Sequence, residues 1–206
     1  MQFVLASQSP ARLMVLRNAG IDPVVQVSGV DEDAIVAALP AEAGHEHVVV
    51  TLAEAKARVV AEHHTDAVII GCDSMLSQGG QLVGKPGTPE RARERWQRMA
   101  GGKGVLLTGH TVLRVLDGVV TAIATGTVST TIQFGSPSEA ELEAYIATGE
   151  PMEVAGGFTL DGRGGWFVDG IEGDPASVIG ISLALTRRLL HELDVSVIDL
   201  WRGPTP

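Results

Sequence analysis

The sequence predicts an α/β fold, and three features support that prediction. The chain of 206 residues is 45% hydrophobic but only 4% aromatic, an aliphatic composition that suits packed layers of sheet and helix. The run Ala67–Cys72 is almost continuously apolar, as expected for a central strand covered on both faces. A short apolar strand followed at once by a well-punctuated helix opens the chain. The length suits one compact unit, so we predict a single domain over residues 1–206.

The first strand and helix are marked by their end signals. Phe3–Ala6 is predicted as a short buried strand. Ser9 can cap the helix that follows, Pro10 occupies its first position and Gly20 closes it. Val24–Val27 then alternates as a second short strand.

The next segment leads from an acidic turn to the central strand. Residues 29–33 are predicted to form that turn, and residues 44–47 a loop. The stretch Thr51–Glu54 matches a capping box, which predicts a helix over Leu52–His63. The buried strand Ala67–Cys72 follows directly.

The middle of the chain predicts a helix and an antiparallel hairpin. Residues 88–90, Thr-Pro-Glu, open a helix that stops at Gly101. Two β-rich runs, Val105–Leu116 and Val119–Phe134, flank Asp117-Gly118. This dipeptide between two apolar runs is the strongest short-range hairpin signal, so this part of the sheet is predicted to be antiparallel.

The last third mixes helices with an irregular glycine-rich stretch. Ser138 and Glu141 repeat the capping-box pattern and open a helix. Residues 156–173 are too rich in glycine for regular structure. Ser182–Leu193 is predicted as the last helix, and Val195–Leu200 as a closing strand.

Composition excludes several classes of protein. The formal net charge is −10, which argues against a nucleic-acid or membrane-surface binder, because such a protein needs a basic face. Cys72 is the single cysteine, so we expect no internal disulfide and a reducing compartment. No signal peptide or apolar run long enough to span a membrane is found. We therefore expect a cytoplasmic protein.

The loop Ser7–Arg12 is a candidate anion site. It lies between a predicted strand and a helix N-terminus, where free N–H groups and the helix dipole favour an anion. Arg12 stands in the first helical turn, which is unfavourable for a cation unless an anion is bound. The alternative is an ordinary Ser9 cap with a solvated arginine.

Two acidic positions are candidates for metal binding. Asp73 directly follows the apolar strand, and ligands of open α/β sheets bind at the carboxyl ends of strands. Carboxylate oxygens of this kind suit Mg²⁺. Asp31, Glu32 and Asp33 form a second acidic cluster. Its alternative is a solvated turn, and the spacing of Asp73 alone leaves function and structure equally open.

Read together, these motifs resemble the Maf family. Each motif alone is weak, but five or more in the family's order and spacing, from Leu5 to about Leu183, are strong. They are SQSPAR at 7–12, the S-x-V-[DE]-E turn at 28–32, AKA at 55–57, GCDS at 71–74, GKP at 84–86, and the stretch GDPASVIGI at 173–181.

The resemblance implies a fold and an activity. The fold is a mixed, twisted α/β sheet with flanking helices in two lobes around a cleft, related to the ITPase-like house-cleaning pyrophosphatases. The activity is hydrolysis of a nucleoside triphosphate to the monophosphate and pyrophosphate with a divalent cation, Mg²⁺ or Mn²⁺. Relatives often prefer dTTP, UTP or modified nucleotides, and the family is named for an effect on septum formation.

The resemblance also implies roles for particular residues. Asp73 matches the catalytic proton acceptor and Glu32 the second catalytic acid, and both are expected to bind the metal. The expected substrate contacts are Ser7, Ser9, Arg12, Lys56, Lys85 and Asp161.

Departures from the family pattern bear on specificity. Ala11 stands where relatives commonly have a second arginine. Asp161 replaces a glutamine, so a nucleotide base bound at that position would have a different hydrogen-bonding partner. The rival reading is a non-catalytic nucleotide- or partner-binding regulator of septum formation and cell division. Retention of the catalytic acids and of two lysines favours the enzyme. A homodimer is compatible with the sequence, although no segment identifies an interface.

Overall fold

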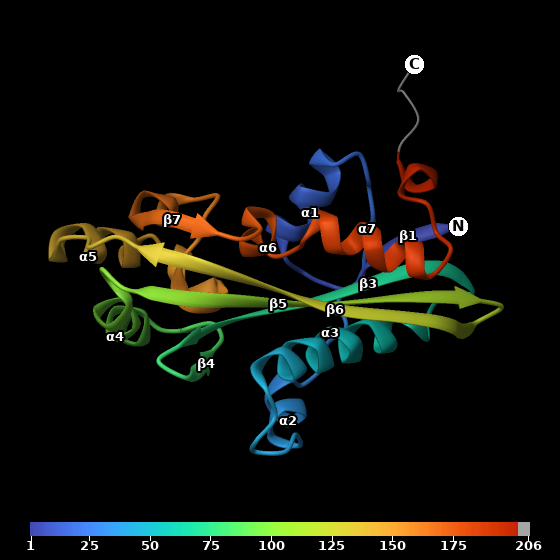
Figure 1. Cartoon of the computed structure of the whole chain (residues 1–206), viewed down its shortest axis with the longest axis horizontal. Coiled ribbons are helices and arrows are strands. Elements are labelled where there is room, and N and C mark those ends of the chain that lie inside the picture. Colours follow the sequence, from blue (N-terminus) through green and yellow to red (C-terminus); the bar gives the residue numbers. More distant parts are fainter. Residues whose placement is uncertain (202–206) are drawn as a thin grey trace. The chain divides into compact units, whose positions relative to one another are not determined.

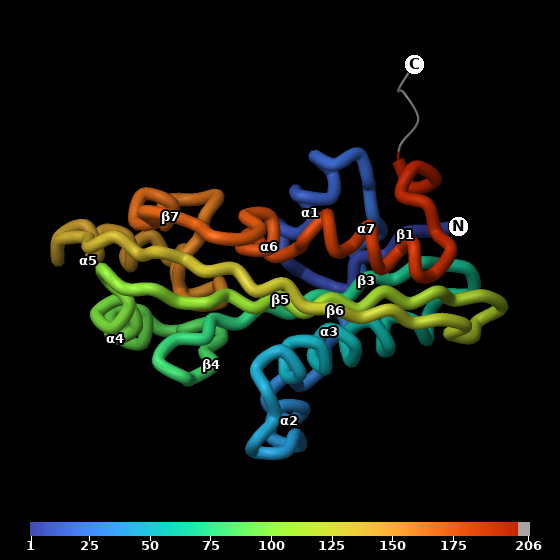
Figure 2. The backbone as a smooth tube through the Cα atoms, in the orientation of Figure 1, coloured from blue at the N-terminus to red at the C-terminus, as the bar shows by residue number. Residues whose placement is uncertain are grey.

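The structure, a computed structural model, describes residues 1–201 as an α/β protein, which confirms the predicted class. The chain divides into two compact units that interleave along the sequence. The first unit holds Met1–Asp73, Thr108–Val128 and the chain from Gly180, and the second holds Ser74–Leu107 and Ser129–Ile179. Figure 2 follows the backbone through both. The predicted single domain and the cleft between lobes stay predictions.

The strands pair in the order β2-β1-β3-β5-β6-β7, with β4 on β3. Within the first unit, β1 (Gln2–Leu5) runs parallel to β2 (Val24–Val25) and to β3 (Asp66–Gln78). The first predicted strand is thus confirmed to within one residue, and the second is shorter than predicted. β5 (Lys103–Leu116) and β6 (Val119–Phe134) contribute residues to both units.

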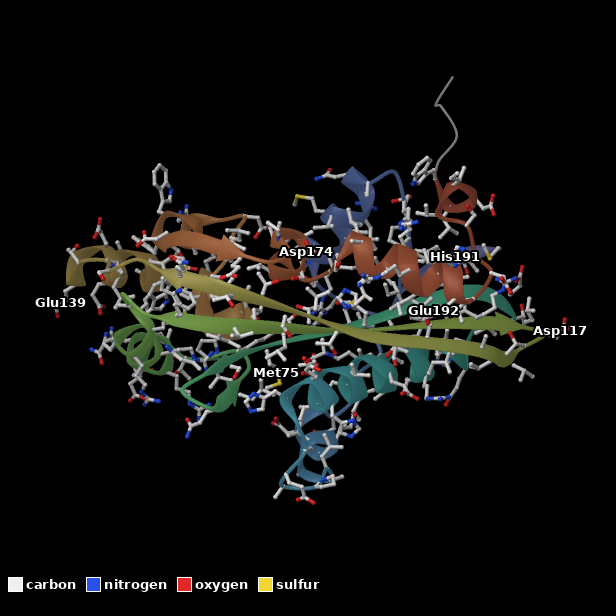
Figure 3. All side chains as sticks on the ribbon, in the orientation of Figure 1. Met75, Asp117, Glu139, Asp174, His191 and Glu192 are labelled. Atoms are coloured by element: carbon white, nitrogen blue, oxygen red, sulfur yellow. The ribbon has the colours of Figure 1, made fainter. Side chains whose placement is uncertain are left out.

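The β5–β6 connection confirms the predicted hairpin. Asp117 and Gly118 both have positive φ, 52° and 76°, as the tight two-residue turns that match strand twist require. Figure 3 labels Asp117 at the tip of this hairpin.

Helix α1 (Pro10–Asn18) begins as the sequence predicts. The Ser9 hydroxyl accepts a hydrogen bond from the backbone N–H of Arg12 at 3.4 Å, and Pro10 occupies the first turn. Gly20, with φ 87°, follows the end of the helix and allows the chain to reverse there.

In the first unit helices cover both faces of the sheet (Figure 1). α1 and α7 (Leu183–Glu192) pack on the face that carries Val68, Ile70 and Cys72. α3 (His45–Ala61) packs on the opposite face, which carries Ala67 and Ile69. The apolar run in β3 is therefore buried from both sides, as predicted, and the helix predicted at Ser182–Leu193 is confirmed with Ser182 as its cap.

The start of α3 was predicted wrongly. The capping-box pattern at Thr51–Glu54 placed it at Leu52, but the helix begins at His45 and the predicted loop at 44–47 is largely its first turn. Thr51 lies inside the helix, where its hydroxyl donates to the carbonyl of His47 at 2.8 Å. Val48 and Val49 are buried and extend the apolar stripe of Leu52 toward the N-terminus, so tertiary packing outweighs the local cap signal.

The predicted acidic turn is a helix start. Asp31 caps α2 (Glu32–Ala37), and its carboxylate accepts a hydrogen bond from the backbone N–H of Ala34 at 2.9 Å. An aspartate and an acidic first turn are typical of a helix N-terminus. Glu32 therefore stands in the first turn of a helix instead of in a solvated turn.

Two glycines let α3 rest directly on the sheet. A Cβ atom built on Gly71 of β3 would lie 2.1 Å from the carbonyl oxygen of Ala53, and one on Gly109 of β5 would lie 2.4 Å from the backbone carbonyl of Val49. Real Cβ atoms do not approach backbone this closely, so neither position has room for a side chain. We call this pair the glycine seat of α3.

The second unit contains strands that run antiparallel. β4 (Gln81–Val83) pairs antiparallel with β3, and β7 (Val168–Glu172) pairs antiparallel with β6. Together with the parallel strands of the first unit, they make the sheet mixed, as predicted. β7 lies inside the stretch 156–173, so the prediction that this stretch lacks regular structure was wrong in part.

An aromatic cluster forms the core of the second unit. Trp96 lies on α4 (Pro89–Met99), and its ring meets Phe134, Tyr145 and Phe167 edge to face at centroid distances of 5.9, 6.0 and 5.8 Å. Tyr145 belongs to α5 (Glu139–Ala147), which opens with the predicted capping box between Ser138 and Glu141. Both predicted helices are confirmed.

Short turns complete the two units. The second unit also contains η1 (Glu150–Glu153), η2 (Ala155–Gly157), η3 (Arg163–Phe167) and α6 (Pro175–Ile179). In the first unit, Val195–Leu200 was predicted as a strand, but η4 (Val197–Leu200) occupies most of it. Ser196 caps this 3-10 turn by accepting from the backbone N–H of Ile198, and that local bond competes with strand pairing. No helix of the described residues has the length and apolar content needed to cross a membrane.

The glycine seat yields a stability prediction. Gly71→Ala would place a methyl group against the α3 backbone, so we expect it to lower the free energy of unfolding by about 3 kcal/mol or more, or to prevent folding. Gly44→Ala is the matched control, because Gly44 has φ −62° and open space around its Cβ position; it should cost about 1 kcal/mol or less. Urea unfolding of both variants checks this, and equal midpoints would contradict the close contact.

Candidate active site

A lysine and two acids meet at the centre of the candidate site. Lys56 Nζ lies 2.6 Å from Asp73 Oδ1 and 2.7 Å from Glu32 Oε1. Lys56 and Asp73 are only 8% and 6% exposed, whereas the Glu32 side chain is 53% exposed. The structure thus brings together both predicted catalytic acids and one predicted phosphate contact, all within the first unit.

The glycine seat determines where this cluster forms. Alternate residues of a strand share a face, so Asp73 points to the same side of β3 as Gly71, toward α3. Because the helix backbone lies directly against Gly71, Lys56, one turn after Ala53 on α3, is within reach of Asp73.

The predicted position of Asp73 in the strand needs a correction. The sequence placed it at the carboxyl end of its strand, but β3 continues to Gln78. The parallel pairing of β1 with β3 ends where Leu5 meets Ile70. Asp73 therefore lies three residues beyond the carboxyl end of the neighbouring parallel strand, which is where α/β sheets bind ligands.

Burial and the neighbouring positive charges shift the pKa of Asp73 in opposite directions. Burial raises the pKa of this carboxyl above its ordinary value, and the adjacent Lys56 and the charge of Arg12 counteract only part of that effect. Glu32, a second negative charge, adds to the increase. A carboxyl whose pKa is raised in this way accepts a proton more readily than an exposed aspartate does.

Cys72, the neighbour of Asp73, faces the opposite side of β3. It is fully buried in the core beneath α1 and α7. Burial raises the pKa of its thiol to about 11, although Arg12 and Lys56 oppose the increase. The thiol is thus a packing group and not a nucleophile at neutral pH.

The loop before α1 holds Arg12 in a defined orientation. Arg12 Nη1 donates to the hydroxyl of Ser7 at 3.1 Å, and the backbone N–H of Ser9 donates to the same oxygen at 3.2 Å. Ser7 is itself only 8% exposed. The three residues predicted as phosphate contacts from this loop are therefore in direct contact with one another.

Gly180 is a residue that the motif reading did not single out. Its carbonyl oxygen accepts a hydrogen bond from Arg12 Nε at 2.9 Å. Its φ is 133°, and a Cβ atom there would come within 3.1 Å of the Arg12 side chain. Gly180 lies in the GDPASVIGI stretch, so the signal was in the sequence, but nothing in the local pattern connects it to Arg12.

The two remaining predicted site residues belong to the second unit. Lys85 is exposed and follows Gly84, whose carbonyl oxygen accepts hydrogen bonds from Arg95 Nη1 and from the backbone N–H of Gly156. Asp161 is exposed in the loop between η2 and η3.

Glu150 organises the loop that carries Asp161. Its Oε1 accepts hydrogen bonds from the Thr159 hydroxyl and, at 3.0 Å, from the backbone N–H of Gly164. These bonds fix the two sides of the loop around Asp161. No motif of the sequence predicts this role for Glu150.

The two central carboxylates fit a hard divalent cation. Among residues 1–201 no group of three or more His, Cys, Asp and Glu side chains is placed to hold a metal ion. Mg²⁺, however, is commonly bound by one or two carboxylates together with substrate phosphate oxygens and water. Asp73 and Glu32 supply that number of carboxylates, and both already lie against a cationic nitrogen, that of Lys56.

Comparisons with known proteins agree with one another. A family model described as Maf-like protein matches residues 2–193. A protein from Rhodococcus opacus is 61% identical over 97% of this chain and 95% of its own length. Relatives from Saccharopolyspora erythraea and Nocardia farcinica are 59% and 60% identical, and cover 99% and 98% of this chain and 99% and 97% of their own lengths. All three are named nucleoside triphosphate pyrophosphatase.

The Lys56 cluster yields a pH-dependent stability prediction. Lys56→Met leaves two carboxylates without their cation, so we expect it to lower the free energy of unfolding by about 3 kcal/mol at pH 7.5. The variant should also raise the pKa of Asp73 further. A raised carboxyl pKa means that the folded state holds the proton more tightly than the unfolded state does, so the loss should shrink as the pH falls through that pKa.

Urea unfolding at pH 7.5 and pH 5, in buffer with a chelator, measures this effect. Arg58→Met is the control on the same helix, because Arg58 makes an exposed ion pair with Glu54; it should cost about 0.5 kcal/mol or less at both pH values. If Lys56→Met lowers the free energy of unfolding by the same amount at both pH values, the carboxylates are not the cause of the loss.

Proposed function

This chain belongs to the Maf family, and from that premise we propose that it is a nucleoside triphosphate pyrophosphatase. It cleaves the bond between the α and β phosphates and releases a nucleoside monophosphate and pyrophosphate. The observation that supports this most directly is the contact of Lys56 with both Asp73 and Glu32. This contact joins a buried proton acceptor, a second acid and a phosphate-binding cation in one place.

In this proposal Asp73 is the general base. Its carboxylate removes a proton from the water that attacks the α phosphate. Burial supports the role, because it raises the pKa of Asp73 toward the working pH and thereby strengthens it as a base. Lys56 holds one oxygen of the carboxylate and so orients the group toward that water.

The triphosphate carries about four negative charges into a chain whose formal net charge is −10. Cations aimed at the phosphates must therefore neutralise them locally. Arg12 is held in place by hydrogen bonds to Ser7 and Gly180. With Lys56 and Lys85, it is proposed to bind the phosphate oxygens.

Glu32 and Asp73 are proposed to hold one Mg²⁺ or Mn²⁺ ion together with the phosphates. When bound, the cation would add positive charge at the phosphates and lower the pKa of the attacking water. Because both acids contact Lys56, a bound cation would share them with the ammonium group. Glu32 is the more exposed acid and stands in the first turn of a short helix, so it is the one that can adjust.

The base, the cell compartment and the assembly belong to the same proposal. Asp161 is exposed and offers carboxylate oxygens where relatives have a glutamine amide, so we expect it to favour a base that donates hydrogen bonds. Pyrimidine nucleotides and modified nucleotides are the first to test, and the process served would be the cleaning of the nucleotide pool. We place the protein in the cytoplasm and allow for a homodimer.

The test is a product assay with the purified chain, Mg²⁺ or Mn²⁺, and a panel of canonical and modified nucleoside triphosphates. We expect pyrophosphate and monophosphate in equal amounts, and no turnover after chelation. Release of orthophosphate would contradict the proposed bond. Nucleotide binding without any turnover would favour the alternative of a non-catalytic regulator of cell division.

The same assay tests whether Asp73 is the general base. Asp73→Asn should lower kcat by roughly 100-fold or more, because it removes the proton acceptor while keeping the side-chain shape. Asp66→Asn is the control: Asp66 lies on the same strand, is 53% exposed and pairs with Arg114 and the N-terminus. The Asp66→Asn variant should keep full activity. A comparable loss of kcat in both variants would show that Asp73 is not the general base.

A further inference from the structure

Helix α4 carries four arginines, and one of them differs from the rest. Arg93 makes a bidentate pair with Glu143 at 2.5 and 2.7 Å. Arg98 is 70% exposed and lies 3.8 Å from Glu94, and Arg91 is exposed. Arg95 is half-buried, and no carboxylate of residues 1–201 lies within ion-pair distance of it.

Among residues 1–201, the side chain of Arg95 makes one hydrogen bond, to the turn that carries Lys85. Its Nη1 donates to the carbonyl oxygen of Gly84, which also accepts from the backbone N–H of Gly156 at 3.1 Å. The stem of Arg95 lies along Gly157, where a Cβ atom would be 3.6 Å from Arg95 Cδ. The guanidinium is thus held at the carbonyl of Gly84, the residue before Lys85, by this hydrogen bond and by packing of its stem on Gly157.

Within residues 1–201, no acid pairs with Arg95 to balance its charge. Burial is the main cause that lowers the pKa of its guanidinium, and the like charges of Arg98 and Arg91 add to the effect. A partly buried cation without an acid costs free energy. Lys85 brings a further positive charge to the same turn, so the local field attracts an anion.

From these contacts we infer that Arg95 and Lys85 form an oxyanion site of the second unit, which binds a phosphate group of the substrate. A guanidinium has five N–H donors and only one is used by Gly84, so the others remain for phosphate oxygens. The inference rests on the proposed function, which supplies the phosphate. It adds a binding residue that the motifs did not indicate.

A purely structural reading makes a different prediction. If Arg95 only pins the Gly84 turn, its removal should act through the position of Lys85, and should have no effect once Lys85 is removed. If Arg95 contacts the phosphate itself, its removal should weaken binding even without Lys85.

The experiment measures inhibition of the active enzyme by inorganic pyrophosphate in Arg95→Gln, Lys85→Gln and the double variant. We expect Arg95→Gln to raise the inhibition constant about ten-fold or more, since a charge-assisted bond is lost. The same change should raise it again in the Lys85→Gln background. Arg95→Lys keeps the charge but loses the planar guanidinium with its five donors. Its inhibition constant should therefore lie between those of the wild type and Arg95→Gln.

Arg98→Gln is the matched control, because it removes the same charge from an exposed position on the same helix; its inhibition constant should change less than two-fold. An unchanged constant in Arg95→Gln, or an effect that vanishes without Lys85, overturns the inference. Wild-type protein that makes no pyrophosphate would instead overturn the proposed function, so the two failures are distinguishable. Thermal melting of each variant identifies any loss that comes from unfolding.

Discussion

The first unit depends on one steric constraint, the absence of side chains where α3 crosses the sheet. Gly71 and Gly109 lie on the face that α3 covers, and neither position admits a Cβ atom. The α3 backbone therefore touches the sheet directly, without side chains in between, and this contact sets the distance from helix to sheet. That distance in turn lets the Lys56 ammonium reach Asp73 while both remain almost fully buried.

The electrostatics of the site follow from this close packing. A buried ion pair is expensive unless its geometry is good, and here the lysine satisfies two acids at once. One acid, Asp73, is fixed in a central strand, and the other, Glu32, comes from a short helix near the surface. In the proposed mechanism, this combination of a fixed base and a more exposed second acid suits a site that has to admit a highly charged ligand.

Much of the fold could be predicted because local signals and packing agree. Ser9, Pro10, the Asp117-Gly118 turn and the Ser138 capping box each mark an end that the structure confirms. Predictions failed where long-range packing decides. The start of α3 follows the buried stripe through Val48 and Val49, and not the local cap pattern at Thr51.

The candidate site could be predicted in the same uneven way. Motif order indicated Asp73, Glu32 and Lys56, which do meet, but no sequence pattern links Gly180 to Arg12 across 168 positions. Arg95 is equally hidden, since its difference from Arg93 and Arg98 lies in burial and in the acids nearby. Such features become visible only in three dimensions.

The burial of Cys72 has a practical consequence. Its thiol is sealed in the core and stays protonated at neutral pH, and it is the single cysteine of the chain. Maleimide and other thiol-directed dyes react with accessible thiolates, so they should not label the folded wild-type protein. Cysteines introduced on the surface of each unit can then carry fluorophores without background, and energy transfer between them would report how far apart the units are with and without nucleotide.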